Sequence, residues 1–183
     1  MSKSYRDCLQ ESLDTGKTLR VNSYYVRLRI KNIGRSIARR CEGKLVAIAH
    51  KDLKSLRQDF DPVVLHWVGS DTFIRNFGGG VASIQQSKNF TIDINSKEYE
   101  YLDLMSIDEN SGSYLIQAID YDIPRGIVLD PKRDDYYFLI TVYAENSNPI
   151  SEIYKVVNGQ TYDSVKLKAV SAEEKEKFYA LIE

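Results

Sequence analysis

The stretch that decides the fold runs from Tyr24 to Ala49 and begins Tyr24-Tyr25-Val26-Arg27-Leu28-Arg29-Ile30-Lys31. Its even positions are aromatic or apolar, and from Arg27 onward its odd positions are cationic. Successive side chains of a strand leave opposite faces, so a period of two is typical of a half-buried strand. The first half of the stretch therefore predicts a strand with one core face and one cationic face.

Turn chemistry follows at Asn32-Ile33-Gly34-Arg35-Ser36, where Gly34 is free to adopt a positive φ and Asn32 tolerates one. A second alternating run then begins. Its small and apolar side is Cys41, Gly43, Leu45, Ala47 and Ala49, and its polar side is Arg40, Glu42 and Lys44. The two runs with their turn predict a β-hairpin or a bulged corner.

Outward from this stretch, short strand-like runs alternate with turn residues. They cover residues 18–21, 63–68, 90–94, 98–107, 114–119, 136–144, 153–157 and 165–170. The run at 136–144 is apolar on both faces, which predicts a central strand covered on both sides. Asn146-Ser147-Asn148-Pro149 is predicted to interrupt the chain, and Asn158-Gly159 is a strong hairpin signal. Trp67, the only tryptophan, is predicted to be a core anchor.

Ser171-Ala172-Glu173-Glu174 fits a capping box that begins a C-terminal helix, which Phe178 and Leu181 would dock. The chain is therefore predicted to be all-β, an antiparallel immunoglobulin-like β-sandwich with a short C-terminal α-helix. The predicted organisation is a flexible N-terminal lead-in at 1–17, the sandwich at 18–170 and the helix at 171–183.

The 183 residues suit one domain, and 43% apolar with 28% charged residues is an ordinary globular composition. No apolar run approaches the roughly 18–20 residues that span a bilayer. The N-terminal segment has no apolar core of the signal-peptide type. The sequence as it stands predicts a soluble cytoplasmic protein, whereas a leader or anchor outside it would make the protein membrane-associated.

The pattern Val26-x-Leu28-x-Ile30-x-Asn32-x-Gly34-x-x-x-Ala38, followed by a strand of small residues, resembles bacterial and archaeal immunoglobulin-like modules of the cell-adhesion-related (CARDB-like) type. The resemblance covers about 25 residues strongly. It implies a β-sandwich used for scaffolding or interaction, often beside other domains or a membrane. These modules share no catalytic residues, so the resemblance assigns none here.

Charge is distributed unevenly, although the net charge is only −1. Between Arg20 and Lys44 eight cations stand against one anion, Glu42. The candidate partner-binding residues are Tyr25, Arg27, Arg29, Lys31, Arg35, Arg39 and Arg40. Such a patch suits an acidic protein partner, nucleic-acid phosphates or an anionic membrane surface. Alternatively, the cations pair across the sheet with acids such as Glu98, Glu100 or Asp103.

We expect no catalytic residue, no cofactor and no metal site. His50 and His66 are the only imidazole bases, no nucleophile-elbow motif is present, and Cys8 and Cys41 have no metal-site spacing. A disulfide between these two cysteines stays an open alternative that no sequence feature supports, and Cys41 is expected on the core face. Gly78-Gly79-Gly80 lacks the residues of a phosphate-binding loop and is expected to be a flexible connection. Loop carboxylates are expected to be solvated; they are Asp59, Asp61, Asp120, Asp122, Asp130, Asp134 and Asp135.

The predicted function is therefore a non-enzymatic interaction module, with another protein as the expected partner. Two alternatives remain open at the level of sequence. The first is a hydrolase or carbohydrate-binding protein that uses the loop carboxylates, with Asp120, Asp122 and Asp134 the first candidates for a divalent ion. The second is a nucleic-acid-binding protein that uses the basic face between Arg27 and Arg40.

Overall fold

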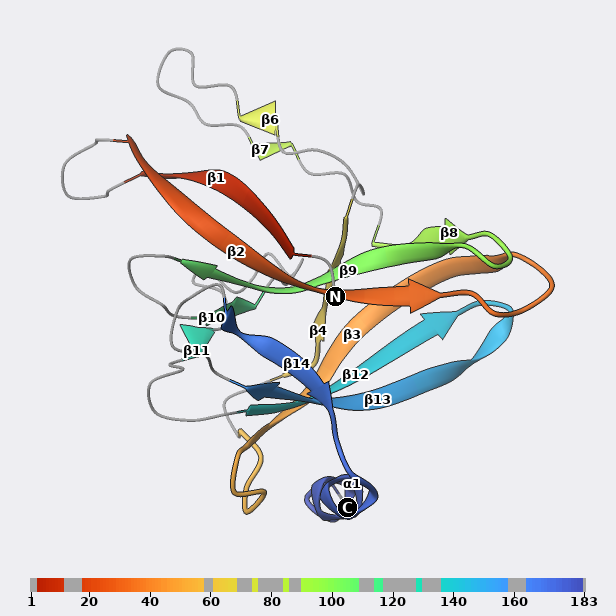
Figure 1. The fold of residues 1–183 in the computed structure, drawn as a ribbon. Coiled ribbons are helices and arrows are strands. Elements are labelled where there is room, and N and C mark those ends of the chain that lie inside the picture. The colour runs from red at the N-terminus through yellow and green to blue at the C-terminus, as the bar shows by residue number, and fades with distance from the viewer. Residues whose placement is uncertain are drawn as a thin grey trace.

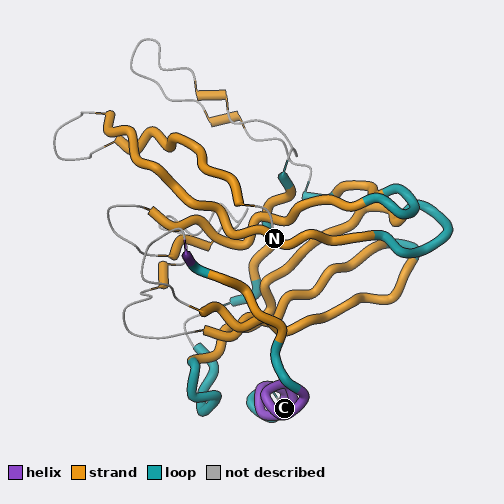
Figure 2. Tube along the Cα trace, in the orientation of Figure 1, coloured by secondary structure: helices purple, strands orange, loops and turns teal. Residues whose placement is uncertain are grey.

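Two large antiparallel sheets, a separate two-stranded ladder and a C-terminal helix form the described part of the computed structural model (Figures 1 and 2). It describes residues 3–11, 18–57, 61–68, 74–75, 84–85, 90–108, 114–116, 128–129, 136–157 and 164–182. The prediction of an all-β sandwich that ends in a short helix is confirmed.

The first sheet has the order β1-β2-β9-β10-β11, with β5 also paired to β9. The bounds are β1 Lys3–Glu11, β2 Thr18–Lys31, β5 His66–Trp67, β9 Tyr99–Asp108, β10 Tyr114–Ile116 and β11 Val128–Leu129. Residues 3–11, expected within a flexible lead-in, instead form β1 and pair with β2 from Lys3↔Val26 to Glu11↔Thr18. An edge strand is held by backbone hydrogen bonds to one neighbour, and a hydrophobic pattern does not reveal such bonds.

The second sheet has the order β14-β13-β12-β3-β4, with β8 also paired to β3. The bounds are β3 Ala38–His50, β4 Val63–Val64, β8 Ile92–Ile94, β12 Tyr136–Ala144, β13 Ser147–Val157 and β14 Lys166–Ala169. A separate ladder joins β6 Ile74–Arg75 to β7 Ile84–Gln85.

The chain changes sheets inside the stretch that decides the fold. β2 pairs with β1 and β9, whereas β3 pairs with β12, β4 and β8. The connection at residues 32–37 is therefore a corner between sheets, and the hairpin alternative is wrong. Residues 63–68 also cross between sheets, because β4 pairs with β3 and β5 pairs with β9.

The expected interruption after Ala144 is present but shorter than predicted, because β13 begins at Ser147 and residues 147–149 belong to this strand. The turn lies one step earlier, at Glu145-Asn146, and joins β12 to β13 as a hairpin. Pro149 fits this strand because β14 pairs only with Tyr154–Val157 and leaves the earlier edge of β13 open. Proline is tolerated where its missing N–H would face away from the neighbouring strand. The Asn158-Gly159 turn lies outside the described residues.

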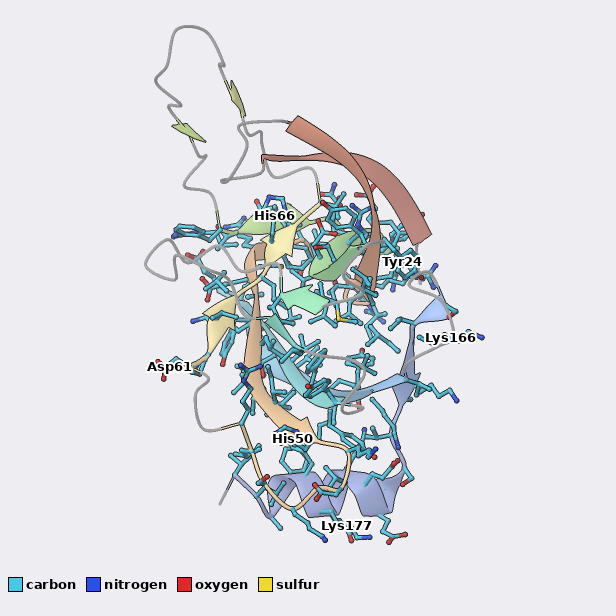
Figure 3. All side chains as sticks on the ribbon, turned by 90° about the vertical axis from the view of Figure 1, so that its left-hand side faces the viewer. Tyr24, His50, Asp61, His66, Lys166 and Lys177 are labelled. Atoms are coloured by element: carbon cyan, nitrogen blue, oxygen red, sulfur yellow. The ribbon has the colours of Figure 1, made fainter. Side chains whose placement is uncertain are left out.

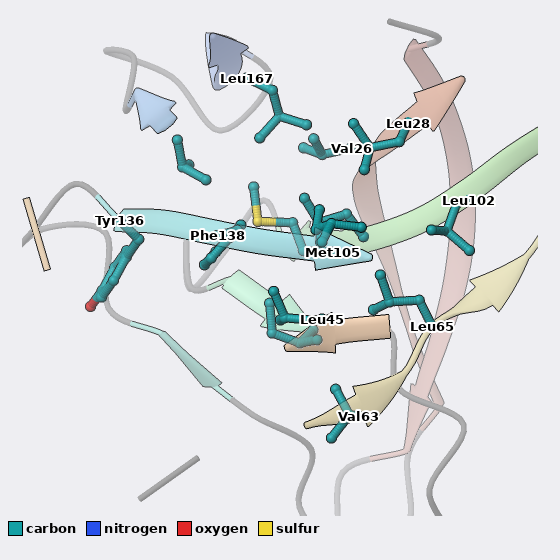
Figure 4. Packing of buried hydrophobic residues seen from close by; sticks show 14 of the residues in the cluster. Val26, Leu28, Leu45, Val63, Leu65, Leu102, Met105, Tyr136, Phe138 and Leu167 are labelled. Carbon is teal, nitrogen blue, oxygen red and sulfur yellow. The ribbon is translucent and has the colours of Figure 1, made fainter. Parts of the chain in front are cut away.

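The main core lies between the sheets. Leu28 and Leu102 from the first sheet and Leu45 and Phe138 from the second contribute to one buried cluster (Figure 4). Trp67 is fully buried there, as predicted, and its indole N–H donates to the Cys41 carbonyl at 3.1 Å. Each fully buried large apolar side chain of this kind contributes roughly 1.5–3 kcal/mol.

The helix α1, Ala172–Tyr179, covers the outer face of the second sheet. Phe178 is fully buried against Tyr137, Leu139 and Ile153, and Leu181 packs beside it. The capping box at Ser171 and Glu174 forms as predicted. Because Phe138 and Ile140 face the main core while Tyr137 and Leu139 lie under the helix, β12 is a central strand covered on both sides.

Candidate binding groove

Three turns gather at one end of the sandwich, at the right in Figures 1 and 2. They are the corner at residues 32–37, the β8–β9 turn at 95–98 and the β12–β13 turn at Glu145-Asn146. Each is held to its neighbours by side-chain and backbone hydrogen bonds, and two asparagines supply most of the side-chain bonds to the corner.

Asn32 ties the corner to β8. Its side-chain amide donates to the carbonyls of Ser36 at 2.8 Å and Ile94 at 2.9 Å, and its Oδ1 accepts from the Gly34 N–H at 2.9 Å. Asparagine forms such a turn because its short amide reaches the backbone two residues ahead. From the β8–β9 turn, Ser96 Oγ donates to the Gly34 carbonyl and Lys97 Nζ donates to the Ile33 carbonyl.

Asn146 ties the other side of the corner to the β12–β13 turn. Its Oδ1 accepts from the Arg39 N–H at 3.0 Å, and its Nδ2 donates to the Ile37 carbonyl at 2.8 Å. The Glu145 N–H donates to the Arg39 carbonyl at 3.0 Å. The corner is thus bonded to a hairpin more than a hundred residues away in the sequence.

A groove of about 270 Å³ opens between the corner and the start of β13, and we call it the corner groove. Most of its lining is apolar, and among the described lining residues Lys31 alone carries a charged side chain. Its lining includes Ile30, Lys31, Ile33, Cys41, Ile94 and Ile150. Two of them stand on the rim: Ile33 is 78% exposed and Ile150 is 71% exposed. Scattered exposed apolar residues are common, but two that border one apolar groove mark a candidate binding site.

Cys41 is a buried free thiol among the lining residues. Burial, together with the Asp93 carboxylate, raises the pKa of this thiol above its ordinary value. The thiol therefore stays protonated at neutral pH, and the protonated form is a poor nucleophile. Its contribution to the groove is apolar surface.

Arg27, predicted as a surface residue, is instead only 6% exposed. Its Nε donates to Asp103 Oδ1 at 2.5 Å, across the β2–β9 pair in which the two residues lie opposite each other. His66 Nδ1 lies 3.7 Å from the other oxygen of Asp103. Tyr25 is half-buried, with the Arg27 guanidinium 5.3 Å from its ring centroid. For Arg27 and Asp103, the cross-sheet pairing considered as an alternative is therefore the correct one.

The other predicted cations are exposed but do not form one uniform surface. Arg29 lies over the Tyr99 ring at 5.3 Å, and Lys31 lines the groove. Arg40 has a φ of 48° at an irregularity in the β3–β8 pairing, and its Nη1 bonds Glu145 Oε1 at 2.8 Å. Arg35 and Arg39 are exposed near the corner. Most of the remaining predicted cations therefore lie in the corner or in the strand ends beside it.

The catalytic and metal candidates are only partly described. Figure 3 places His50 near the helix and His66 in the opposite sheet, so the two imidazoles belong to separate regions. Within the described ranges, no group of three or more His, Cys, Asp or Glu side chains is close enough to hold a metal ion. Of the seven loop aspartates, only Asp61 is described, and it is exposed. The other six and Gly78-Gly79-Gly80 lie outside the described residues.

The sequence reasoning missed the residues that build the groove, above all Ile33, Asn146 and Ile150. The sequence did contain a signal for Ile33. A residue inside the turn Asn32-Ile33-Gly34 is expected to be exposed to solvent, so an isoleucine there cannot be explained as a core residue. Ile150 gave a similar signal as an apolar residue directly after a predicted break. Neither signal shows that the two side chains border the same groove.

The chain matches no protein-family model, no curated protein and no solved structure. In the part of the chain that the structure describes, no helical segment has the length and apolar character that crossing a membrane requires.

Proposed function

We propose that this protein is a non-enzymatic binding module that takes an apolar segment of a partner protein in the corner groove. The observation that carries the proposal is the pair of rim residues, Ile33 and Ile150, exposed on either side of an apolar groove. Apolar side chains at the centre of an interface, surrounded by polar residues, commonly supply most of the binding energy.

The size of the groove favours a protein segment. Pockets that enclose a cofactor or drug-sized ligand usually measure roughly 300–1,000 Å³. The corner groove, at about 270 Å³, falls just below that range, and it suits one or two apolar side chains of a larger partner. The hydrogen bonds of Asn32 and Asn146 fix the corner against β8 and the β12–β13 turn, which lowers the entropy cost of binding at the Ile33 rim.

The immunoglobulin-like assignment of the sandwich is part of the same proposal. It is supported by the Asn32-x-Gly34 corner, where the side chain of Asn32 organises the passage from β2 to β3. Modules of that type work by interaction, in keeping with a binding role and a protein partner.

A selection from a displayed random-peptide library tests the proposal. We expect enriched peptides to share apolar residues and to bind the purified chain in calorimetry. Ile33→Asp and Ile150→Asp should each weaken that binding by about tenfold or more, because each removes an apolar contact that the bound peptide would bury. Ile182→Asp, at an exposed apolar position after α1, is the matched control and should leave the affinity unchanged.

Either of two results would contradict this function. One is that no peptide is enriched. The other is that enriched peptides bind both rim variants as tightly as they bind the original chain.

A further inference from the structure

Within the described ranges, the end of β2 next to the groove has no strand on the side away from β9. The last described pair between β1 and β2 is Lys3↔Val26, whereas β9 continues to pair with β2 as far as Lys31. We call the side of Arg27–Lys31 that faces away from β9 the open edge. At about 3.3 Å per residue, the segment Arg27–Lys31 spans roughly 16 Å, which is long enough to pair with a short added strand.

The pairing of β2 with β9 determines which residues of β2 direct their backbone N–H and C=O groups away from β9. The Asn32 N–H donates to the Glu98 carbonyl, on the side of β9. Backbone groups alternate between the two sides of a strand, so Arg29 and Lys31 direct their N–H and C=O groups away from β9. The irregularity in the β2–β9 pairing does not change this order, because its extra residue, Leu104, lies in β9.

The open edge borders the corner groove. Leu28 is buried, Ile30 packs on the core and lines the groove, and Arg29 is exposed. A strand added beside these residues would direct alternate side chains into the groove, next to Ile30. Its other side chains would lie next to Arg29 and Lys31, where acidic residues form favourable cross-strand pairs.

The facing edge, on β13, is protected against the same kind of pairing. Pro149 has no N–H to offer, and the Ile153 N–H lies 3.4 Å from the carboxylate of Glu152. Proline and charged side chains are devices by which natural sheets block edge pairing. The open edge of β2 has no proline, and its cations, Arg29 and Lys31, repel a second copy of the same edge while they attract an acidic strand.

We propose that the open edge Arg27–Lys31 of β2 is a strand-addition site for an extended segment of a partner protein in which apolar and acidic residues alternate. This proposal rests on the proposed function and specifies the partner of the same groove. Main-chain hydrogen bonds to β2 would supply affinity, and the groove with its neighbouring cations would supply specificity.

A short capped peptide of alternating Glu and Val tests the pairing mode without any change to the protein. Two isomers carry backbone N-methyl groups, one on the Val residues and the other on the Glu residues. An added strand donates alternate N–H groups to β2, so one isomer should lose about tenfold or more in affinity while the other retains it. A Lys and Val peptide of the same length should not bind.

Charge reversal on the protein supplies a second measurement. Arg29→Glu with Lys31→Glu should weaken binding of the Glu and Val peptide by about tenfold or more. The matched control is Lys166→Glu with Lys168→Glu, which has the same spacing on exposed positions of the edge strand β14 and should leave the affinity unchanged. Raised salt should weaken binding to the original chain.

The outcomes separate this proposal from the proposed function. If both methylated isomers bind equally well and Ile33→Asp still weakens binding, the groove binds protein but strand addition is wrong. If the Glu and Val peptide does not bind, strand addition to an acidic partner is overturned, and the library selection alone decides the broader function. Salt-dependent dimers of the free chain that exclude the peptide would identify a second copy as the occupant and also overturn the proposal.

Discussion

Gly43 on β3 and Leu102 on β9 meet across the core at a distance that leaves no room for a side chain at position 43. A Cβ added to Gly43 would lie 2.5 Å from Leu102 Cδ2 and 2.8 Å from Cδ1. Both residues are buried, and they belong to different sheets. The close approach of the two sheets at this point therefore depends on the absence of a side chain.

Gly43→Ala is expected to destabilise the protein by about 1–3 kcal/mol, because the added methyl overpacks the core. Leu102→Ala alone should cost about 2–5 kcal/mol through the cavity that it leaves. In the double variant the new methyl occupies part of that cavity, so the loss should be smaller than the sum. Urea unfolding followed by circular dichroism measures all three, and strictly additive losses would show that the two residues do not share this contact.

Arg27→Ala is expected to lower the free energy of unfolding by about 3–5 kcal/mol, because it leaves the buried Asp103 without its guanidinium partner. Arg29→Ala, two residues along the same strand but exposed, should change it by only about 0.5 kcal/mol. Replacement of the pair by Arg27→Met with Asp103→Leu should recover most of the loss. Equal effects of the two single arginine variants in denaturant unfolding would contradict the burial of this ion pair.

Asn32→Ala is expected to cost about 1–3 kcal/mol, since the carbonyls of Ser36 and Ile94 and the Gly34 N–H lose their side-chain partner. Because Asn32 also fixes one rim of the corner groove, the variant should bind the selected peptides more weakly. Asn148→Ala, at an exposed position on the opposite rim, should stay within about 0.5 kcal/mol. Thermal unfolding and calorimetry on both variants provide the comparison, and unchanged stability in Asn32→Ala would refute the structural role of this side chain.

Glu174 should make the stability of the protein depend on acid pH. The Tyr137 hydroxyl donates to Glu174 Oε1 at 2.7 Å, and together with the Ser171 backbone N–H it lowers the pKa of this carboxyl from 4.5 to about 2. Because the folded pKa is the lower one, the ionised carboxylate contributes stability above about pH 4.5. That contribution is lost as the pH falls toward 2.

Glu174→Gln keeps a side-chain acceptor but removes the charge, so it should cost about 0.5 kcal/mol at pH 7. The gap in unfolding free energy between this variant and the original chain should close between about pH 4.5 and pH 2. Glu176→Gln, on the exposed surface of the same helix, is the control for loss of a helix carboxylate. A gap that stays constant across this pH range would show that Glu174 does not titrate in the folded state as described.

Much of the local structure was predictable because short-range patterns determine it. The alternation from Tyr24 to Lys31 gave a strand whose core face is the expected one, and the apolar run at 136–144 gave β12 with its bounds. The box at Ser171 and Glu174 placed the start of α1, because a capping box needs only residues three apart. Trp67 was predicted to be buried because its large apolar surface favours the core.

The long-range features were not predictable from these patterns. β1 has no apolar stripe and is held by pairing with β2, and residues 147–149 read as a break although they form the start of β13, at an irregularity in its pairing with β12. Alternation assigned Arg27 to the outer face but did not reveal that this part of the face is buried. The residues that line the groove lie as far apart in the sequence as Ile30 and Ile150. A local sequence pattern covers only a few residues, so it cannot include both rims.

The sequence by itself determined the strand at Tyr24 to Lys31 with its apolar face, the strand β12 and the start of the C-terminal helix, since periodicity and capping act over a few residues. Only the tertiary structure decided that the chain turns a corner between sheets after Lys31, that Arg27 is buried in an ion pair with Asp103, and that Ile33 and Ile150 border one groove. These relationships depend on how strands distant in the sequence pair and pack. The gain from such pairing is realised only when the whole core forms.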